Sequence, residues 1–187
     1  LRLTGPARAQ DVGETAPDVE LNQTDDDKTK QKLLEAYDNR IIVLVYWMSI
    51  NHESVQTLDK LQELYEKYHK LGVVIVAVTS EKKEKAEKTI EGKKVEFRVG
   101  YGINPRSPYR FPAPPCAYII DIHKKIVFAR FHPDDDLEGK IKEAIRRAPP
   151  PGADPASLQK RLADLTSFVG QGDFGRAYKL AKELKGF

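Results

Sequence analysis

Two unbroken apolar runs, Ile41–Trp47 and Val73–Val78, dominate the pattern of hydrophobic and polar positions along the chain. Both are rich in β-branched residues and too short for helices, so each predicts a strand that is covered on both faces of a sheet. Between them, from Val55 to Leu71, apolar residues fall at helical spacing, and Gly72 follows where a left-handed cap residue belongs. The pattern predicts a β-α-β unit with two parallel strands and a right-handed crossover.

The remaining periodicities predict smaller elements on both sides of this unit. A short helix is expected over 31–37, a solvated, charged helix over 81–90, and a half-buried strand over 95–99, where Val95, Phe97 and Val99 alternate with polar residues. After a proline-rich loop, the pattern predicts strands at 117–121 and 126–131, a closing helix over 136–147, and two further helices over 157–169 and 173–184.

Composition narrows the classes of function. The chain has 187 residues, a formal net charge of only +3 and a single cysteine. It therefore gives no case for a nucleic-acid partner, and it rules out an internal disulfide. No Cys/His grouping has the spacing of a zinc site, and no apolar run approaches the roughly 20 residues that cross a bilayer. We expect no metal and no cofactor.

The turn after the first strand carries a family resemblance. Tyr46-Trp47 ends the strand, and Met48-Ser49-Ile50 leads into the helix that follows. This arrangement resembles the active-site unit of the thioredoxin superfamily, in its branch of TlpA-like thiol-disulfide oxidoreductases and AhpC/TSA-like redoxins. The resemblance implies an α/β thioredoxin-like fold, with a central mixed sheet flanked by helices, over residues 12–147. The family's Cys-x-x-Cys positions fall on Asn51 and Ser54, so both sulfurs are missing.

Two further segments match the same family. Residues 12–21 resemble the stretch that leads into redoxin domains, and Pro115-Cys116-Ala117-Tyr118 resembles the family's cis-proline motif. We therefore expect a cis peptide between Pro114 and Pro115. In relatives this bend pairs with an extended peptide or with a partner's disulfide loop. The resemblance thus implies a binding site formed by Trp47, Asn51, Ser54, Pro115 and Cys116.

Loss of the two cysteines bears directly on activity. The family's chemistry needs a thiolate, and neither an amide nor a hydroxyl forms a mixed disulfide. Asn51 is expected to cap the helix, and no residue is assigned a catalytic role. Cys116 is expected to be a small buried hydrophobic residue that opens a strand. The alternative for Cys116 is a single-thiol redox or metal site with His52.

Three functions remain open at this point. The first is a redox-inactive thioredoxin-like binding domain that takes an extended peptide or protein partner in the cis-Pro groove. The second is a thiol-disulfide oxidoreductase or peroxidase-like enzyme that relies on Cys116 alone. The third is a structural spacer for a helical-repeat protein. The missing cysteines favour a protein that is not an enzyme.

Residues 1–11 are expected to be disordered, and Ala7-Arg8-Ala9 resembles the tail of a secretory signal, which predicts a periplasmic or secreted protein. Residues 148–156 have the composition of a proline-rich linker. Residues 157–187 are expected to form a helical hairpin, in which Gln171-Gly172-Asp173-Phe174 resembles part of a tetratricopeptide repeat. One such unit buries little by itself, so we expect either that the hairpin packs on the thioredoxin-like domain or that the natural chain continues into further repeats beyond Phe187.

Overall fold

The computed structural model describes residues 11–21, 31–104, 109, 111, 113–132, 136–148 and 155–184. Of the predicted N-terminal segment 1–11 only Asp11 is described, and of the predicted linker 148–156 the residues 149–154 lie outside the described ranges, while Pro155 and Ala156 already belong to a helix. Within the described residues, no helix is long and apolar enough to cross a membrane.

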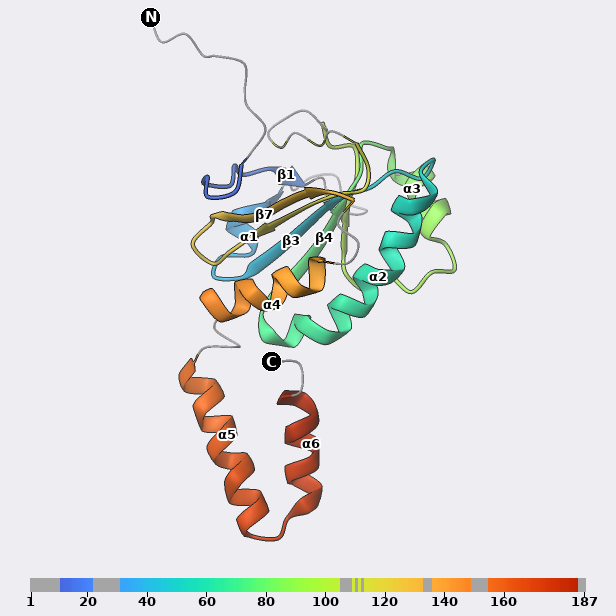
Figure 1. Ribbon diagram of the computed structural model, residues 1–187. Helices are drawn as coiled ribbons and strands as arrows, with labels where there is room; N and C mark the ends of the chain where they lie inside the picture. Colours follow the sequence, from blue (N-terminus) through green and yellow to red (C-terminus); the bar gives the residue numbers. More distant parts are fainter. Residues whose placement is uncertain are drawn as a thin grey trace, which may run out of the picture.

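A five-stranded mixed sheet forms the centre of the fold, with strand order β5-β4-β3-β6-β7. Its strands are β3 (Ile41–Tyr46), β4 (Val73–Val78), β5 (Arg98–Gly100), β6 (Cys116–Ile120) and β7 (Ile126–Phe131). The two apolar runs pair in parallel, with Ile41 opposite Val73, as the sequence predicts. The central strand β3 pairs antiparallel with β6 on its other side, and β6 pairs antiparallel with β7. The sheet and its covering helices confirm the expected thioredoxin-like fold (Figure 1).

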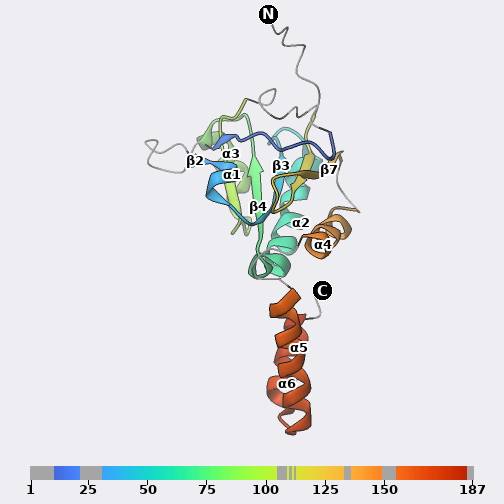
Figure 2. The same ribbon diagram turned by 90° about the vertical axis from the view of Figure 1, so that its left-hand side faces the viewer.

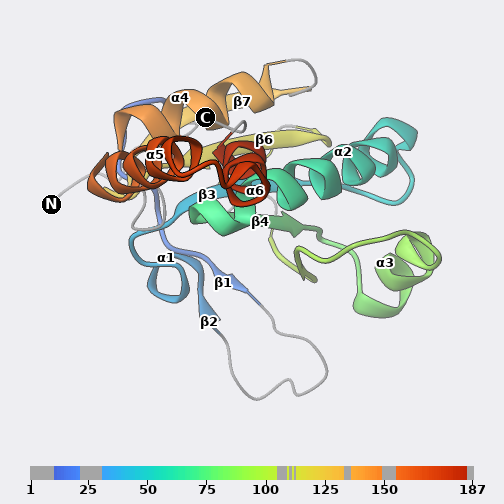
Figure 3. The same ribbon diagram turned by 90° about the horizontal axis from the view of Figure 1, so that it is seen from below.

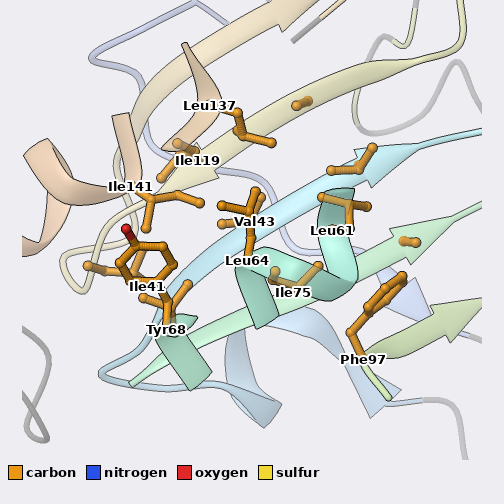
Figure 4. Close-up of a cluster of buried hydrophobic side chains, with 14 of the residues drawn as sticks. Ile41, Val43, Leu61, Leu64, Tyr68, Ile75, Phe97, Ile119, Leu137 and Ile141 are labelled. Carbon is orange, nitrogen blue, oxygen red and sulfur yellow. The ribbon is translucent and has the colours of Figure 1, made fainter. Parts of the chain in front are cut away.

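Helices α2 (His52–Tyr68) and α4 (Leu137–Arg147) cover one face of this sheet (Figure 1). Ile41, Val43 and Ile75 project from the strands into the core between the layers, where they meet Leu61 and Leu64 of α2 (Figure 4). The Tyr68 hydroxyl at the end of α2 donates a hydrogen bond of 2.8 Å to Glu138 of α4. The chain then makes a short 3-10 turn, His69–Leu71, and Gly72 takes the left-handed conformation (φ 86°) expected of it.

The N-terminal part of the domain covers the opposite face. A two-stranded ribbon of β1 (Glu20–Leu21) and β2 (Gln31–Lys32) leads into α1 (Leu33–Ala36), and their apolar side chains join a second core. Figure 3 shows this group beside the sheet, away from α4. Residues before β1 are fixed to the β6–β7 hairpin, since Gly13 donates to Ile126 and Ala16 donates to Lys124, both over 2.8 Å.

Helices α5 (Pro155–Gly170) and α6 (Phe174–Leu184) form an antiparallel hairpin, close to the predicted ranges. They run side by side and are seen apart from the sheet and its covering helices (Figures 1 and 2). Asp173 caps α6 by accepting from the Arg176 N–H, and the Arg176 guanidinium lies 4.9 Å from the centre of the Phe168 ring. Ala177 is the apolar side chain that the hairpin buries among its described residues.

Two predicted elements need correction. The strand expected over 95–99 is wrong in extent, because pairing with β4 begins only at Arg98 and β5 runs to Gly100. Gln62 of α2 forms hydrogen bonds with the N–H and the carboxylate of Glu96 instead. Residues 95–97 therefore contact α2 and do not pair with β4. The charged helix expected over 81–90 is α3 (Lys83–Ile90), and Glu81, which precedes it, is buried rather than solvated.

Candidate functional site

The turn between β3 and α2 ends in a side-chain cap. Asn51 has an extended backbone (φ −103°, ψ 111°), and its Oδ1 accepts a 2.8 Å hydrogen bond from the N–H of Ser54. This bond satisfies one of the free N–H groups that begin every helix, so Asn51 is the N-cap that the sequence predicts. Its neighbour Ile50 is 76% exposed, which makes the turn an apolar projection beside the cap.

Asn51 also contacts the loop that precedes β6. Its Nδ2 donates to the carbonyl oxygen of Pro114 over 3.2 Å, across 63 positions of sequence. The peptide bond between Pro114 and Pro115 is cis. The turn before α2 and the proline bend before β6, which both resemble parts of the family's active site, are therefore in contact. The contact is made by Asn51, which occupies one of the family's cysteine positions.

Hydrogen-bonding capacity at the bend is one-sided. Prolines carry no N–H, so neither Pro114 nor Pro115 can donate. The Pro114 carbonyl accepts from Asn51, and the Pro115 carbonyl accepts from the backbone N–H of His132 over 3.0 Å. Each carbonyl has a second lone pair, so the bend offers acceptors to an incoming group and no donors. Pro115 itself is buried, while Pro114 is half-buried and reaches the surface.

The other predicted site residues on the α2 side of the sheet lie inside the core. Ser54 and Trp47 are fully buried. Neither the Ser54 hydroxyl nor the Trp47 indole N–H has a hydrogen-bond partner among the residues described. Both lie beneath the surface. The accessible residues of the turn are the exposed Ile50 and His52 and the half-buried Met48, Ser49 and Asn51, and the half-buried Pro114 lies beside Asn51.

Cys116 lies on the other face of the sheet. It is opposite Tyr46 in the β3–β6 register, and it packs in the core that α1 covers, with Tyr118 and Phe111 nearby. Its side chain is 3% exposed, and burial raises the pKa of the Cys116 thiol to about 12. The raised pKa disfavours the thiolate at neutral pH, the opposite of what a reactive cysteine needs. This geometry supports the buried hydrophobic role for Cys116 and separates it from His52, which is exposed at the start of α2.

Sequence reasoning missed Glu81 as a part of this region. Its carboxylate accepts from the Ser49 N–H over 2.9 Å and from the Ser49 hydroxyl over 2.7 Å, and it also binds Lys85. Burial acts to raise the pKa of the Glu81 carboxyl, but the bonds from Lys85 and Ser49 outweigh it, so the pKa lies below its ordinary value. The Glu81 carboxylate therefore fixes the turn from the side opposite Pro114. The local sequence pattern does not predict the contact between Ser49 and Glu81, which are 32 positions apart.

His132 is exposed at the end of β7. Its ring Nδ1 contacts the carboxylate of Glu53 in the first turn of α2, while its backbone N–H reaches Pro115. With φ of 51°, His132 turns the chain sharply after β7. His132 thus connects the helix start to the proline bend on the side away from Glu81.

Comparison with known families agrees with this geometry. The sequence model of the AhpC/TSA family matches residues 12–129, well over half of the chain. The chain belongs to the AhpC/TSA family. This membership confirms the resemblance to redoxins, and the one cysteine of the chain fits a member that lacks the Cys-x-x-Cys pair. A comparison with curated protein sequences finds no match.

Solved structures show where this AhpC/TSA member sits among thioredoxin-like folds. It is similar to thiol:disulfide interchange protein DsbE from Chlorobium tepidum, with 23% identity and a TM-score of 0.62 over 73% of this chain and 99% of that one. The thioredoxin domain of a thiol-disulfide oxidoreductase from Bacteroides vulgatus matches at 18% identity, with a TM-score of 0.61 over 73% and 99% of the two chains. A thiol-disulfide oxidoreductase from Bacteroides fragilis gives 19% and 0.60 over 70% and 98%. At these identities the likeness establishes the fold alone.

Proposed function

We propose that this AhpC/TSA member is a redox-inactive binding domain that holds an extended segment of a protein partner at the cis-Pro groove. The groove is defined here as the surface formed by Ile50, Asn51 and Pro114. The observation that carries the proposal is the hydrogen bond from Asn51 to the Pro114 carbonyl. It keeps the turn and the bend together without sulfur, so the recognition surface persists where the chemistry has gone.

The bonding capacity of the groove indicates what the partner supplies. Because the bend accepts and does not donate, the partner contributes N–H groups to the free lone pairs of the carbonyls. The exposed Ile50 side chain offers an apolar contact beside them. A partner segment that is extended and carries an apolar residue satisfies both features.

Site-specific photocrosslinking tests this function. A benzophenone amino acid placed at Ile50 is expected to crosslink a defined protein in an extract of the native host. The same probe at Val12, which is 61% exposed and lies away from the groove, is the matched control. The crosslink at Ile50 should disappear when Asn51→Ala or Pro115→Ala is added. A crosslink that survives both changes, or that appears equally at Val12, would contradict binding at this groove.

The rival function is an enzyme that uses Cys116 alone. The rival requires an accessible thiolate, and the burial and raised pKa of the Cys116 thiol speak against one. Insulin reduction and peroxide consumption by wild type and Cys116→Ser distinguish the two functions. Turnover that Cys116→Ser abolishes would replace the binding proposal with the enzymatic one.

Two predictions about context accompany this proposal. The helical hairpin of α5 and α6 makes the domain a candidate spacer or interaction unit in a helical-repeat protein, a role that the length of the natural gene product tests. A periplasmic or secreted location stays a prediction, and cell fractionation with an antibody to the domain tests it.

A further inference from the structure

The exposed apolar side chains of this protein are concentrated on the helical hairpin. Of the large hydrophobic side chains that are exposed in the described part of the chain, all but Val12 and Ile50 belong to α5 and α6. Because a single pair of helices buries little apolar surface of its own, a second surface that covers these side chains would stabilise the hairpin. The exposed side chains of the hairpin are Leu162, Val169, Phe174 and Tyr178.

Helical geometry places these side chains on one side of the hairpin. The least exposed side chains, Leu165 and Phe168 of α5 and Ala177 and Leu180 of α6, mark where the two helices meet. At 3.6 residues per turn, the exposed apolar positions of each helix lie about a quarter to a third of a turn from these contact positions, in the same rotational sense. Since the helices run antiparallel, equal rotations in the same sense point to the same side. We call this side the hairpin apolar face, and it consists of Leu162, Val169, Phe174, Tyr178 and Ala181.

The hairpin apolar face carries no charge among the side chains that the structure describes. By the same geometry, the charged residues that point away from the helix contact, Lys160, Asp164, Arg176 and Lys179, fall on the opposite side of the hairpin. A charged partner surface would have to bury its charges against this face without counter-ions, which is costly. A second copy of the face is apolar and uncharged, and it brings no like charges together.

The positions of the side chains along the hairpin also suit a second copy. With a rise of about 1.5 Å per residue, Leu162 lies about 12 Å from the end of α5, whereas Phe174 begins α6 at that same end of the hairpin. Val169 lies close to this end, and the smaller Ala181 lies about 10 Å from it. A two-fold axis through the middle of the face therefore sets Leu162 against Phe174 of the partner subunit, and Val169 against Ala181 of the partner subunit. Each contact occurs twice, as an isologous interface requires.

The area of the face indicates a weak, reversible contact. Phe174 and Tyr178 are 69% and 72% exposed. At about 200 Å² for each aromatic side chain, they present about 280 Å² of apolar surface. Leu162 and Val169 are about half exposed and bring the face to roughly 400–500 Å², a size at which apolar patches mark interaction sites. Two such faces bury about 800–1,000 Å² in total, which is at the lower limit for a specific interface.

We propose that this protein forms a weak two-fold dimer through the hairpin apolar face, in which α5 and α6 of two chains pack as a four-helix bundle. The second hairpin supplies the apolar cover that one hairpin lacks, and the cations of both hairpins stay in water. The contact uses no residue of the cis-Pro groove, so the dimer and the binding function can fail separately.

Sedimentation velocity of the whole chain tests self-association. Between loading concentrations of about 5 and 500 µM, which bracket the affinity of a small interface, the weight-average mass should rise from that of one chain towards that of two. Leu162→Glu should weaken the association at least about tenfold, because it buries a carboxylate against an apolar surface. The matched control is Ala163→Glu, which adds the same charge at the next, exposed position of α5, away from the face. This control should leave the association unchanged.

Disulfide trapping tests the two-fold arrangement. Leu162→Cys and Phe174→Cys are made in separate chains, mixed and oxidised, and the native Cys116 is buried. A disulfide needs Cα atoms within about 7 Å, so a mixed disulfide between the two variants should form in preference to either homodimer. Ala163→Cys mixed with Phe174→Cys should give little mixed disulfide.

Three results would overturn the proposal. The first is a mass that stays at one chain over the whole concentration range. If Leu162→Glu, and not Ala163→Glu, also lowered the free energy of unfolding of that monomer, the chain's own thioredoxin-like domain would be the surface that covers the face. The second is a dimer that both glutamate substitutions weaken equally, or that neither weakens. The third is trapping without preference for the pair of positions 162 and 174.

Discussion

The carboxylate of Glu81 accepts two hydrogen bonds from Ser49, one from the backbone N–H over 2.9 Å and one from the hydroxyl over 2.7 Å. Glu81 stands just before α3, and Ser49 lies in the turn between β3 and α2. The pair links β4 and β3 at the edge of the sheet where the family's active site is built. It explains how the turn keeps its shape without a disulfide to stabilise it.

Glu81→Gln should therefore destabilise the protein at neutral pH, by about 1 to 3 kcal/mol, because a buried, charge-assisted network is lost. The pKa of the Glu81 carboxyl is lowered by folding, so its contribution to stability is present above the ordinary carboxyl pKa and lost as the pH falls below it. The free energy of unfolding of wild type, measured with urea, should fall between neutral pH and pH values below about 4. The free energy of unfolding of Glu81→Gln should fall less over the same pH interval.

Glu84→Gln is the control for this experiment. Glu84 lies in the first turn of α3, three residues after Glu81, and is exposed. Its change should alter the free energy of unfolding by no more than about 0.5 kcal/mol. Equal effects of the two substitutions would mean that Glu81 does not stabilise the turn.

Ser54→Ala should stabilise the protein. The Ser54 hydroxyl is fully buried and has no partner among the described residues, so its removal relieves a desolvation cost of about 1 kcal/mol. The matched change is Thr57→Val, one turn along α2, where the hydroxyl donates to the Glu53 carbonyl over 2.9 Å. Chemical denaturation should move in opposite directions for the two variants. Destabilisation by Ser54→Ala would show that the hydroxyl has a partner, such as a bound water.

Asn51→Cys combined with Ser54→Cys should restore a redox-active pair. The two positions begin α2, where the N-terminal field lowers the pKa of a thiol below its free value of about 8.5. The oxidised double variant should lose the two thiols introduced at positions 51 and 54, and the reduced double variant should reduce insulin. Neither single variant should do so. If the oxidised double variant forms no disulfide, the two positions do not have the geometry of the family's pair.

Cys116 should resist thiol reagents in the folded protein. With a pKa of about 12 and 3% exposure, it presents almost no thiolate at neutral pH. Its reaction with Ellman's reagent should accelerate by at least about a hundredfold in urea, where the pKa returns to its free value. A rate in native buffer close to the rate in urea would contradict the burial of this side chain.

Local patterns predicted the parts of the fold that local physics decides. The apolar runs that begin at Ile41 and Val73 correctly predicted β3 and β4, and Asn51 was correctly predicted as the N-cap of α2. These features depend mainly on residues that are close in sequence. The strand at Val95 failed because the tertiary contact between Gln62 and Glu96 overrides a correct alternation. Glu81 was placed in solvent because its charged neighbours dominate that segment, whereas its partner Ser49 is 32 positions away.

Side-chain direction was the harder part of the site. Strict alternation along β6 sends Cys116 and Tyr118 to one face and Ala117 and Ile119 to the other. The cis-proline motif predicted that Cys116 lies near the start of α2. Alternation along β6 instead directs its sulfur into the core on the other face of the sheet, which α1 covers. Counting faces from the register of β3 and β6 would have removed it from the candidate site residues.

The amide of Asn51 also determines how any complex at its surface ends. Relatives that attack a disulfide pass through a covalent linkage, and a second thiol must cut that linkage before the partner leaves. An amide tethered to a carbonyl forms no such linkage. Residence time here is therefore set by the dissociation rate alone, and it is independent of glutathione and of the redox potential of the compartment.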